Sequence, residues 1–403
     1  MIKKYCKKIT TILLIVLLIG MAAFMSGCET YDAFMEEFVL VDEEPEETVR
    51  IGVFEPLSGK DKHFGELEKK GIELARELFP SALNKQVELI YADNQSDIYV
   101  AESAIQELIS KRPAVILGSY GDVYTLIAAK YVEKAEIPAI AITNTNPLVT
   151  GHNPYYFRVC FVETYQGIAL AKFTVEELGV NSAAILRQKS DDTAIAMSQS
   201  FGDKMRQMTE DENAVKLTLE FTPGQESFET EILRLKSTQI PVVFLPVSVI
   251  DAVKILIEAE KQDYDAVFLG TEELLNDDFL ARVGDAAELV AISSVYDPDT
   301  QINDMSETFL NAYKKKYGKD AVPEPEVALG FDAYIIAIDS LNRIGTALDG
   351  KLMANSIALE TSFPGASGNI TFDSNGDPMK SVVIKGVKNG EFISLYTMEP
   401  IFE

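Results

Sequence analysis

Short apolar segments alternate with amphipathic helical patterns along most of this 403-residue chain. "VRIGVF", "QVELIY", "AVIL" and "PAIAI" read as buried strands, and the stretches between them have helical periodicity, as in Glu66–Phe79 and the segments that begin at Asp97 and Asp122. The same alternation restarts after Glu163 with "SAAIL", "VKLTLEF", "PVVFL" and "AVFL". Buried strands that alternate with helices indicate parallel sheets covered by helices. Two such runs in series predict two similar α/β lobes.

The C-terminal part follows a different pattern. Helices are expected over about 302–317 and 327–344, and "GNITFDSNGDP", "SVVIKGV" and "EFISLY" follow them. Asn375-Gly376 and Asn389-Gly390 are dipeptides typical of tight hairpin turns. We therefore expect a small antiparallel set of strands at this end of the chain.

The N-terminus carries an export signal. Four lysines precede a 14-residue apolar stretch, Ile12–Met25, which is shorter than the roughly 20 residues that a membrane-spanning helix needs. Small residues then lead into Cys28, and this arrangement resembles a bacterial lipoprotein signal. That resemblance implies removal of residues 1–27 and lipidation of Cys28. The alternative is an uncleaved anchor followed by a chance cysteine.

Charge restricts the partners of the mature chain. The net charge is −27, and removing a segment with four lysines and no acidic residue makes it −31. Such a surface repels nucleic acid and anionic lipid, so we expect no nucleic-acid partner and a membrane attachment through lipid alone. Residues 28–48 contain nine acidic residues and are expected to be a disordered tether with a reach of about 70 Å.

The mature chain has little of the chemistry that enzymes use. Its two histidines, His63 and His152, have no cysteine pair nearby, and Cys160 is the only cysteine after Cys28. We therefore expect no metal site and no internal disulfide, with Cys160 as a buried apolar residue. The usual hydrolase, P-loop and dinucleotide-binding glycine motifs are absent, and no cofactor is expected. A pair of carboxylates could still serve a glycosidase, but 63 acidic residues make a nearby pair unremarkable, so we predict that the chain is not an enzyme.

Eight segments, in order along residues 49–396, resemble the type I periplasmic binding proteins, in particular the leucine/isoleucine/valine-binding branch that serves ABC importers. They are "IGVFEPLSG" (51–59), "FGELEKKGIELA" (64–75), "TNPLVTGHNPYYFRV" (145–159), "QGIALAKFTVEELG" (166–179), "GTEELLNDDFL" (270–280), "FLNAYKKKYGK" (309–319), "LGFDAYIIAI" (329–338) and "GNITFDSNGD" (368–377).

The resemblance implies an α/β fold of two Rossmann-like lobes with parallel sheets, joined by a hinge of three chain crossings near 160–164, 290–296 and 350–365. We assign 49–162 plus 295–350 to the first lobe and 163–294 plus 351–403 to the second. The ligand would lie between the lobes, at the carboxyl ends of the strands, and closure of the hinge would bury it.

The same resemblance suggests how an amino acid would be held. Thr145 matches a threonine that binds the ligand's α-carboxylate, and Thr143 matches a neighbouring residue that offers a backbone carbonyl. Glu272 matches the acid that pairs with the ligand's ammonium group, and Phe64 matches an aromatic wall of the side-chain pocket. Turn formation, a solvated loop and core packing are the ordinary alternatives for these residue types.

Departures from the family pattern leave the ligand open. Asp122 stands where the family has a serine, and it would either cap its own helix or face the ligand and repel a carboxylate. Glu326 stands where relatives often place an aromatic residue near the ligand. Thr193, Leu245 and Ser248 stand where relatives often carry tyrosine in the second lobe. Together these residues put a branched-chain ligand in doubt and point toward a polar or cationic one.

The resulting hypothesis is a monomeric, lipid-anchored receptor on the extracytoplasmic side of the membrane. It would bind an amino acid of the branched-chain type, or a related small polar molecule, and deliver it to the permease subunits of an ABC importer. The alternatives are a ligand sensor with the same fold and a receptor for a cationic or polar ligand that is not an amino acid.

Overall fold

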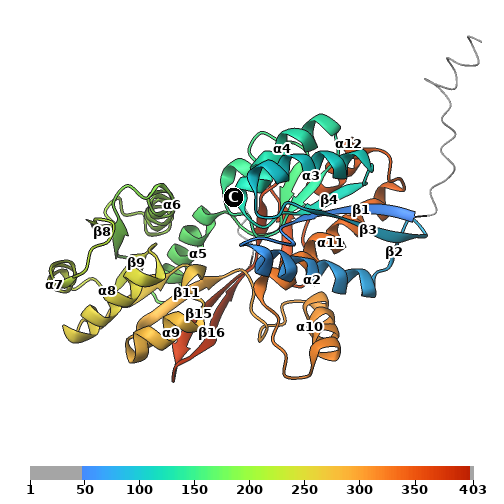
Figure 1. The fold of residues 1–403 in the computed structure, drawn as a ribbon. Helices are drawn as coiled ribbons and strands as arrows, with labels where there is room; N and C mark the ends of the chain where they lie inside the picture. Colours follow the sequence, from blue (N-terminus) through green and yellow to red (C-terminus); the bar gives the residue numbers. More distant parts are fainter. Residues whose placement is uncertain (1–47, 400–403) are drawn as a thin grey trace, which may run out of the picture. The chain divides into compact units, whose positions relative to one another are not determined.

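The computed structural model describes residues 48–399, so the predicted export signal, Cys28 and most of the predicted acidic tether lie outside the described residues. Within residues 48–399, no helix combines the length and the apolar character that crossing a membrane requires. Three sheets and the helices around them make up this part of the chain (Figure 1).

The first sheet has six strands in the order β2-β3-β1-β4-β5-β6. All pairs are parallel except β2 with β3. The central strands are buried on both faces, which explains their continuous apolar sequence. The strands are β1 (Thr48–Glu55), β2 (Ser81–Ala82), β3 (Lys85–Asp93), β4 (Val115–Gly118), β5 (Ala139–Ala141) and β6 (Tyr156–Arg158).

Helices of the first run connect these strands as the alternation predicted. They are α2 (Lys62–Leu78), α3 (Ile98–Ser110) and α4 (Asp122–Ala135). The carboxylate of Asp97 caps α3 by accepting hydrogen bonds from the backbone of Tyr99 and Val100, which satisfies two N–H groups that a helix leaves unpaired.

The second sheet has seven strands in the order β16-β15-β11-β10-β9-β7-β8. Within this sheet, β7 to β11 pair in parallel, whereas β15 and β16 join one edge as antiparallel strands. The strands are β7 (Ala183–Gln188), β8 (Val215–Phe221), β9 (Val242–Leu245), β10 (Val267–Gly270), β11 (Val290–Ser294), β15 (Val382–Lys388) and β16 (Glu391–Met398). The accompanying helices are α5 (Glu163–Glu176), α6 (Asp192–Thr209), α7 (Glu229–Thr238), α8 (Val249–Lys261) and α9 (Asp277–Val283).

The C-terminal strands do not form one set, contrary to the sequence-based expectation. The hairpin at Asn389-Gly390 extends the second sheet, and both turn residues have positive φ. The strands around Asn375-Gly376 form a separate, three-stranded antiparallel sheet of β12 (Phe363–Gly365), β13 (Gly368–Phe372) and β14 (Pro378–Lys380). A pattern of alternation predicts strands but not the sheet that each one joins.

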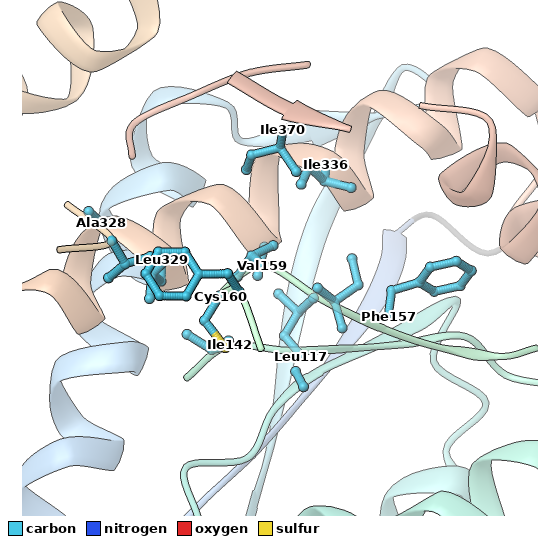
Figure 2. Close-up of a cluster of buried hydrophobic side chains, with 14 of the residues drawn as sticks. Leu117, Ile142, Phe157, Val159, Cys160, Ala328, Leu329, Ile336 and Ile370 are labelled. Carbon is cyan, nitrogen blue, oxygen red and sulfur yellow. The ribbon is translucent and has the colours of Figure 1, made fainter. Parts of the chain in front are cut away.

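Helices from the C-terminal half pack beside the first sheet. They are α10 (Asp304–Tyr317), α11 (Pro325–Ile344) and α12 (Gly350–Ala358). The close-up in Figure 2 shows Ile336 of α11 and Ile370 of β13 in one buried cluster with Leu117 and Phe157 of the first sheet. The chain therefore passes from the first large sheet to the second after β6, leaves the second sheet after β11 for the helices and the three-stranded sheet beside the first one, and returns to the second sheet after β14. On these contacts we propose that the third crossing lies at 380–382, which differs from the expected 350–365 and moves residues 351–380 to the first lobe.

Two glycines let α11 lie against α2 at close range. A Cβ atom on Gly71 would lie 2.0 Å from the carbonyl oxygen of Val327, and one on Gly330 would lie 2.2 Å from that of Glu68. Any larger residue would force the helices apart. This contact holds the first turn of α11 near the carboxyl ends of the first sheet.

Candidate functional site: a cavity lined by carboxylates

A cavity of about 690 Å³ lies at the carboxyl ends of the strands. Its wall combines the start of α2, the loops after β4 and β5, the starts of α5 and α6, the loops after β10 and β11, and the start of α11. This volume is within the usual range for small-molecule sites. Five of the six ligand residues expected from the sequence line it, namely Phe64, Thr143, Thr145, Glu272 and Glu326.

An aromatic pair forms part of the wall. The ring of Phe64 stacks on that of Tyr120, with ring centroids 4.5 Å apart and planes 8° from parallel. Phe64, which the family resemblance suggested as an aromatic wall of the ligand pocket, lines the cavity; its contact with a ligand stays a prediction. Tyr120 was missed, although it lies in the "GSYGD" loop that follows a predicted strand.

A buried pair of carboxyl groups lies behind Thr143. The hydroxyl of Thr143 donates a hydrogen bond to Oε1 of Glu68, and Glu68 and Glu55 are both fully buried. Burial raises the pKa of Glu68 to about 8. Burial, and then the charge of Glu68, raises the pKa of Glu55 well above its ordinary value. Like charges this close cannot both ionise readily, so the pair holds a proton at neutral pH.

Thr145 faces another carboxylate. Its hydroxyl donates to Oε1 of Glu163 over 2.9 Å. Glu163 is the first residue of α5, and both residues line the cavity. A threonine hydroxyl has a single proton to donate, so in this arrangement Thr145 presents lone pairs to the cavity.

Glu272 lies in the loop directly after β10. The Nε2 atom of Gln166 donates a hydrogen bond to Oε1 of Glu272 over 3.3 Å. In return, the backbone N–H of Glu272 donates to Oε1 of Gln166 over 3.1 Å. Ser293 fixes Gln166 with a further bond of 2.8 Å to the same oxygen. Burial, followed by the charge of Glu326, raises the pKa of Glu272 to about 7, and Lys380 opposes the rise.

Glu326 lies in the first turn of α11 and also lines the cavity. Burial raises its pKa; the charge of Glu324 acts in the same direction, and His63 acts against it. The described lining residues include five glutamates and neither lysine nor arginine. Those glutamates are Glu163, Glu272, Glu273, Glu324 and Glu326.

The capping role expected for Asp122 is wrong. Gly121, with φ of 89°, occupies the N-cap position of α4, and no side chain caps this helix. Asp122 is instead the first helical residue, where the helix dipole stabilises its charge. Its Oδ1 atom is buried without a hydrogen-bond partner. Asp122 is also absent from the described lining of the cavity, so the alternative of direct ligand contact finds no support in this arrangement.

The three residues that stand where relatives often carry tyrosine lie in different environments. Thr193 lines the cavity. Leu245 is buried in the core of the second sheet, and Ser248 caps α8 through a hydrogen bond from the backbone of Asp251. Cys160 is buried and free, as the sequence predicted.

Comparison with known proteins places this cavity in context. The sequence model of a family described as periplasmic binding proteins matches residues 48–391. "Leu/Ile/Val-binding protein homolog 2" of Brucella abortus is 24% identical over 340 residues, which cover 83% of this chain and 88% of that protein.

Solved structures share the fold over nearly their whole length. A leucine-binding protein from Thermotoga maritima superimposes with a TM-score of 0.69 at 28% identity, covering 87% of this chain and 99% of that one. An ABC-transporter solute-binding protein from R. palustris, solved with benzoate, gives a TM-score of 0.65 at 18% identity and covers 88% of this chain and 97% of its own.

Proposed function

Because the chain belongs to the periplasmic binding protein family, we propose that it is a lipid-anchored receptor that binds a small amino-group-containing solute outside the cytoplasm and delivers it to an ABC permease. The chain is a substrate-binding protein of the ABC-transporter type, related to the branched-chain amino acid branch. Proteins of this type bind solutes and are not enzymes, in agreement with the catalytic motifs missing from the sequence.

The observation that carries the ligand proposal is Glu272 in the cavity wall. Its carboxylate is oriented by Gln166, which Ser293 holds in turn. A carboxylate fixed in this way is suited to a charge-assisted hydrogen bond with an ammonium group. The benzoate-bound neighbour indicates that the fold alone does not determine the ligand class.

We propose Cys28 as the lipid attachment site. The observations that support it are the basic and apolar segments before it and the small residues at 26–27. In cells that process lipoproteins, the C28S variant should be released from membranes. Retention of C28S on the membrane would favour an uncleaved anchor.

A thermal-shift screen tests the solute-binding function. The mature chain with C28S would be screened against the proteinogenic amino acids, aliphatic diamines and aromatic carboxylates. A ligand at 100 times its Kd raises the free energy of unfolding by about 2.7 kcal/mol, which gives a clear shift in Tm. A folded protein that no compound in these three classes stabilises would contradict the proposal.

Small-angle scattering tests the mechanism of capture. A ligand shifts a conformational equilibrium only through its different affinity for the two forms. If lobe closure buries the solute, the radius of gyration should fall when the best ligand of the screen saturates the protein. An unchanged radius at saturation would contradict closure.

A further inference from the structure

Thr145, which was expected to hold a ligand carboxylate, and two donors near it are already used within the protein. Thr145 donates its only hydroxyl proton to Glu163, and Thr143 donates its proton to Glu68. The backbone N–H of Tyr120, in the loop before α4, donates to Oε2 of Glu55 over 2.9 Å. The protons of these three donors are therefore already engaged, and a carboxylate beside Thr145 would meet the lone pairs of its hydroxyl.

The charges of the cavity wall also disfavour a ligand carboxylate. Five glutamates line the cavity, and the described lining contains His63 but no lysine or arginine. One of the five, Glu324, has a basic partner outside the lining, since its Oε2 lies 3.9 Å from Nζ of Lys70. The nearby ammonium group of Lys380 is buried and donates to Ser367 over 2.5 Å and to the carbonyl of Val159 over 3.3 Å. A ligand with a net positive charge would offset more of the negative charge of this wall than a neutral zwitterion would.

Aromatic rings add a surface that suits a cation with an alkyl chain. The stacked rings of Phe64 and Tyr120 line the cavity close to the acidic groups. An ammonium group is attracted to the face of an aromatic ring, and methylene groups pack on such a ring.

We propose that this cavity takes an organic cation with a net positive charge, such as an aliphatic diamine or a basic amino acid, in preference to a zwitterion with an aliphatic side chain. The inference rests on the proposed function and specifies the ligand class of that same site. Glu272 and Glu326 accept hydrogen bonds from the cationic groups, and Phe64 and Tyr120 contact the chain between them.

Three compounds of similar shape test the proposed ligand class. L-Norleucine and L-lysine have side chains of similar length and differ by one ammonium group, and cadaverine resembles lysine without its carboxylate. Isothermal titration should show lysine and cadaverine binding at least tenfold more tightly than norleucine. Norleucine or leucine binding as tightly as both cations would overturn the cation proposal and leave the solute-binding function intact.

Variants that replace a glutamate by glutamine test the role of Glu326. E326Q should weaken cadaverine binding at least tenfold, because it removes one of the carboxylates that face the cation. E212Q removes the same charge from an exposed glutamate between α6 and β8, and it should leave the affinity unchanged. If E326Q, with an unchanged Tm, binds cadaverine as tightly as the parent protein, the proposed role of Glu326 is wrong. Failure of every class in the thermal-shift screen would instead contradict the solute-binding function itself.

Discussion

The charged groups of the two large sheets lie in environments that range from fully buried to partly exposed. Beside the first sheet, Glu55, Glu68 and Arg158 are fully buried. The second sheet has a buried pair, Lys385 with Asp297 at 2.8 Å, and also a pair at its edge, Arg187 with Glu220, in which the glutamate side chain is 39% exposed. Glu272, at the end of a strand in the second sheet, lines the cavity.

This difference separates charges that stabilise the fold from charges that can meet a ligand. A buried ion needs its partner, because removing that partner leaves an uncompensated charge in a medium of low dielectric constant. An exposed pair is solvated with or without its partner and contributes little. We therefore expect substitutions near the first sheet to change stability and substitutions in the cavity wall to change binding.

The largest expected effect is a loss of stability when the ion pair of Arg158 is broken. The Nε atom of Arg158 lies 2.6 Å from Oδ1 of Asp377, and its terminal nitrogens donate to Thr150 and to the carbonyl of Asn144. D377A should lower the free energy of unfolding by about 3 kcal/mol, because it leaves the buried guanidinium without its counter-ion. E220A, the matched change in the second sheet, should cost less than about 1 kcal/mol. Equal losses in urea denaturation would contradict the comparison.

The next effect concerns binding. E272Q should weaken cadaverine binding by about 1.5–3 kcal/mol, the usual value of a hydrogen bond to a charged group. E68Q removes a carboxyl group that lies behind the wall, and it should change the affinity much less. Titration calorimetry on both variants measures the difference. Full-strength binding by E272Q would exclude Glu272 as the partner of the cation.

The buried carboxyl pair should make stability depend on pH. The pKa of Glu68 rises from its ordinary value of 4.5 to about 8 on folding, so the folded state binds more protons than the unfolded state between these pH values. Stability is therefore full below about pH 4.5 and falls as the pH rises toward 8. Each unit of pKa difference corresponds to about 1.4 kcal/mol. E68Q should flatten this dependence in urea denaturation between pH 5 and pH 8; an unchanged slope would contradict the assignment.

Asp122 should have the smallest effect. D122S removes a charge from the first turn of α4, where its interaction with the helix dipole is worth at most about 1 kcal/mol. Because Asp122 is absent from the described cavity lining, the affinity for cadaverine and norleucine should not change. A gain in norleucine affinity would show that Asp122 faces the ligand.

Much of the fold could be predicted from local sequence patterns. Continuous apolar runs such as "VRIGVF" identified strands, and Asp97 marked the start of a helix, because strand burial and helix capping depend on neighbouring residues. Thr143, Thr145 and Glu272 were named as candidates by the resemblance to the family, and all three line the cavity at the carboxyl ends of the strands, where parallel sheets usually bind ligands.

Contacts between distant residues could not be predicted in the same way. Glu55 ends an apolar strand and Glu68 lies on a helix, and nothing in either segment shows that the two carboxyl groups share one buried site. The bond from Thr145 to Glu163 joins residues on either side of a chain crossing. Asp122 was expected at the N-cap of α4, but Gly121, with its positive φ, occupies that position. The helix therefore begins at Asp122, one residue earlier than it would if Asp122 were the cap.

The affinity of cadaverine at two pH values tests the cationic site. Cadaverine keeps both positive charges between pH 6 and pH 8, whereas Glu272, with a pKa near 7, changes from mostly protonated to mostly ionised. Glu326, Glu163 and Lys380 also act on Glu272 electrostatically. Titration calorimetry should show binding roughly tenfold tighter at pH 8 than at pH 6, as expected when one carboxylate must ionise. Equal or weaker binding at pH 8 would contradict a cation held by Glu272.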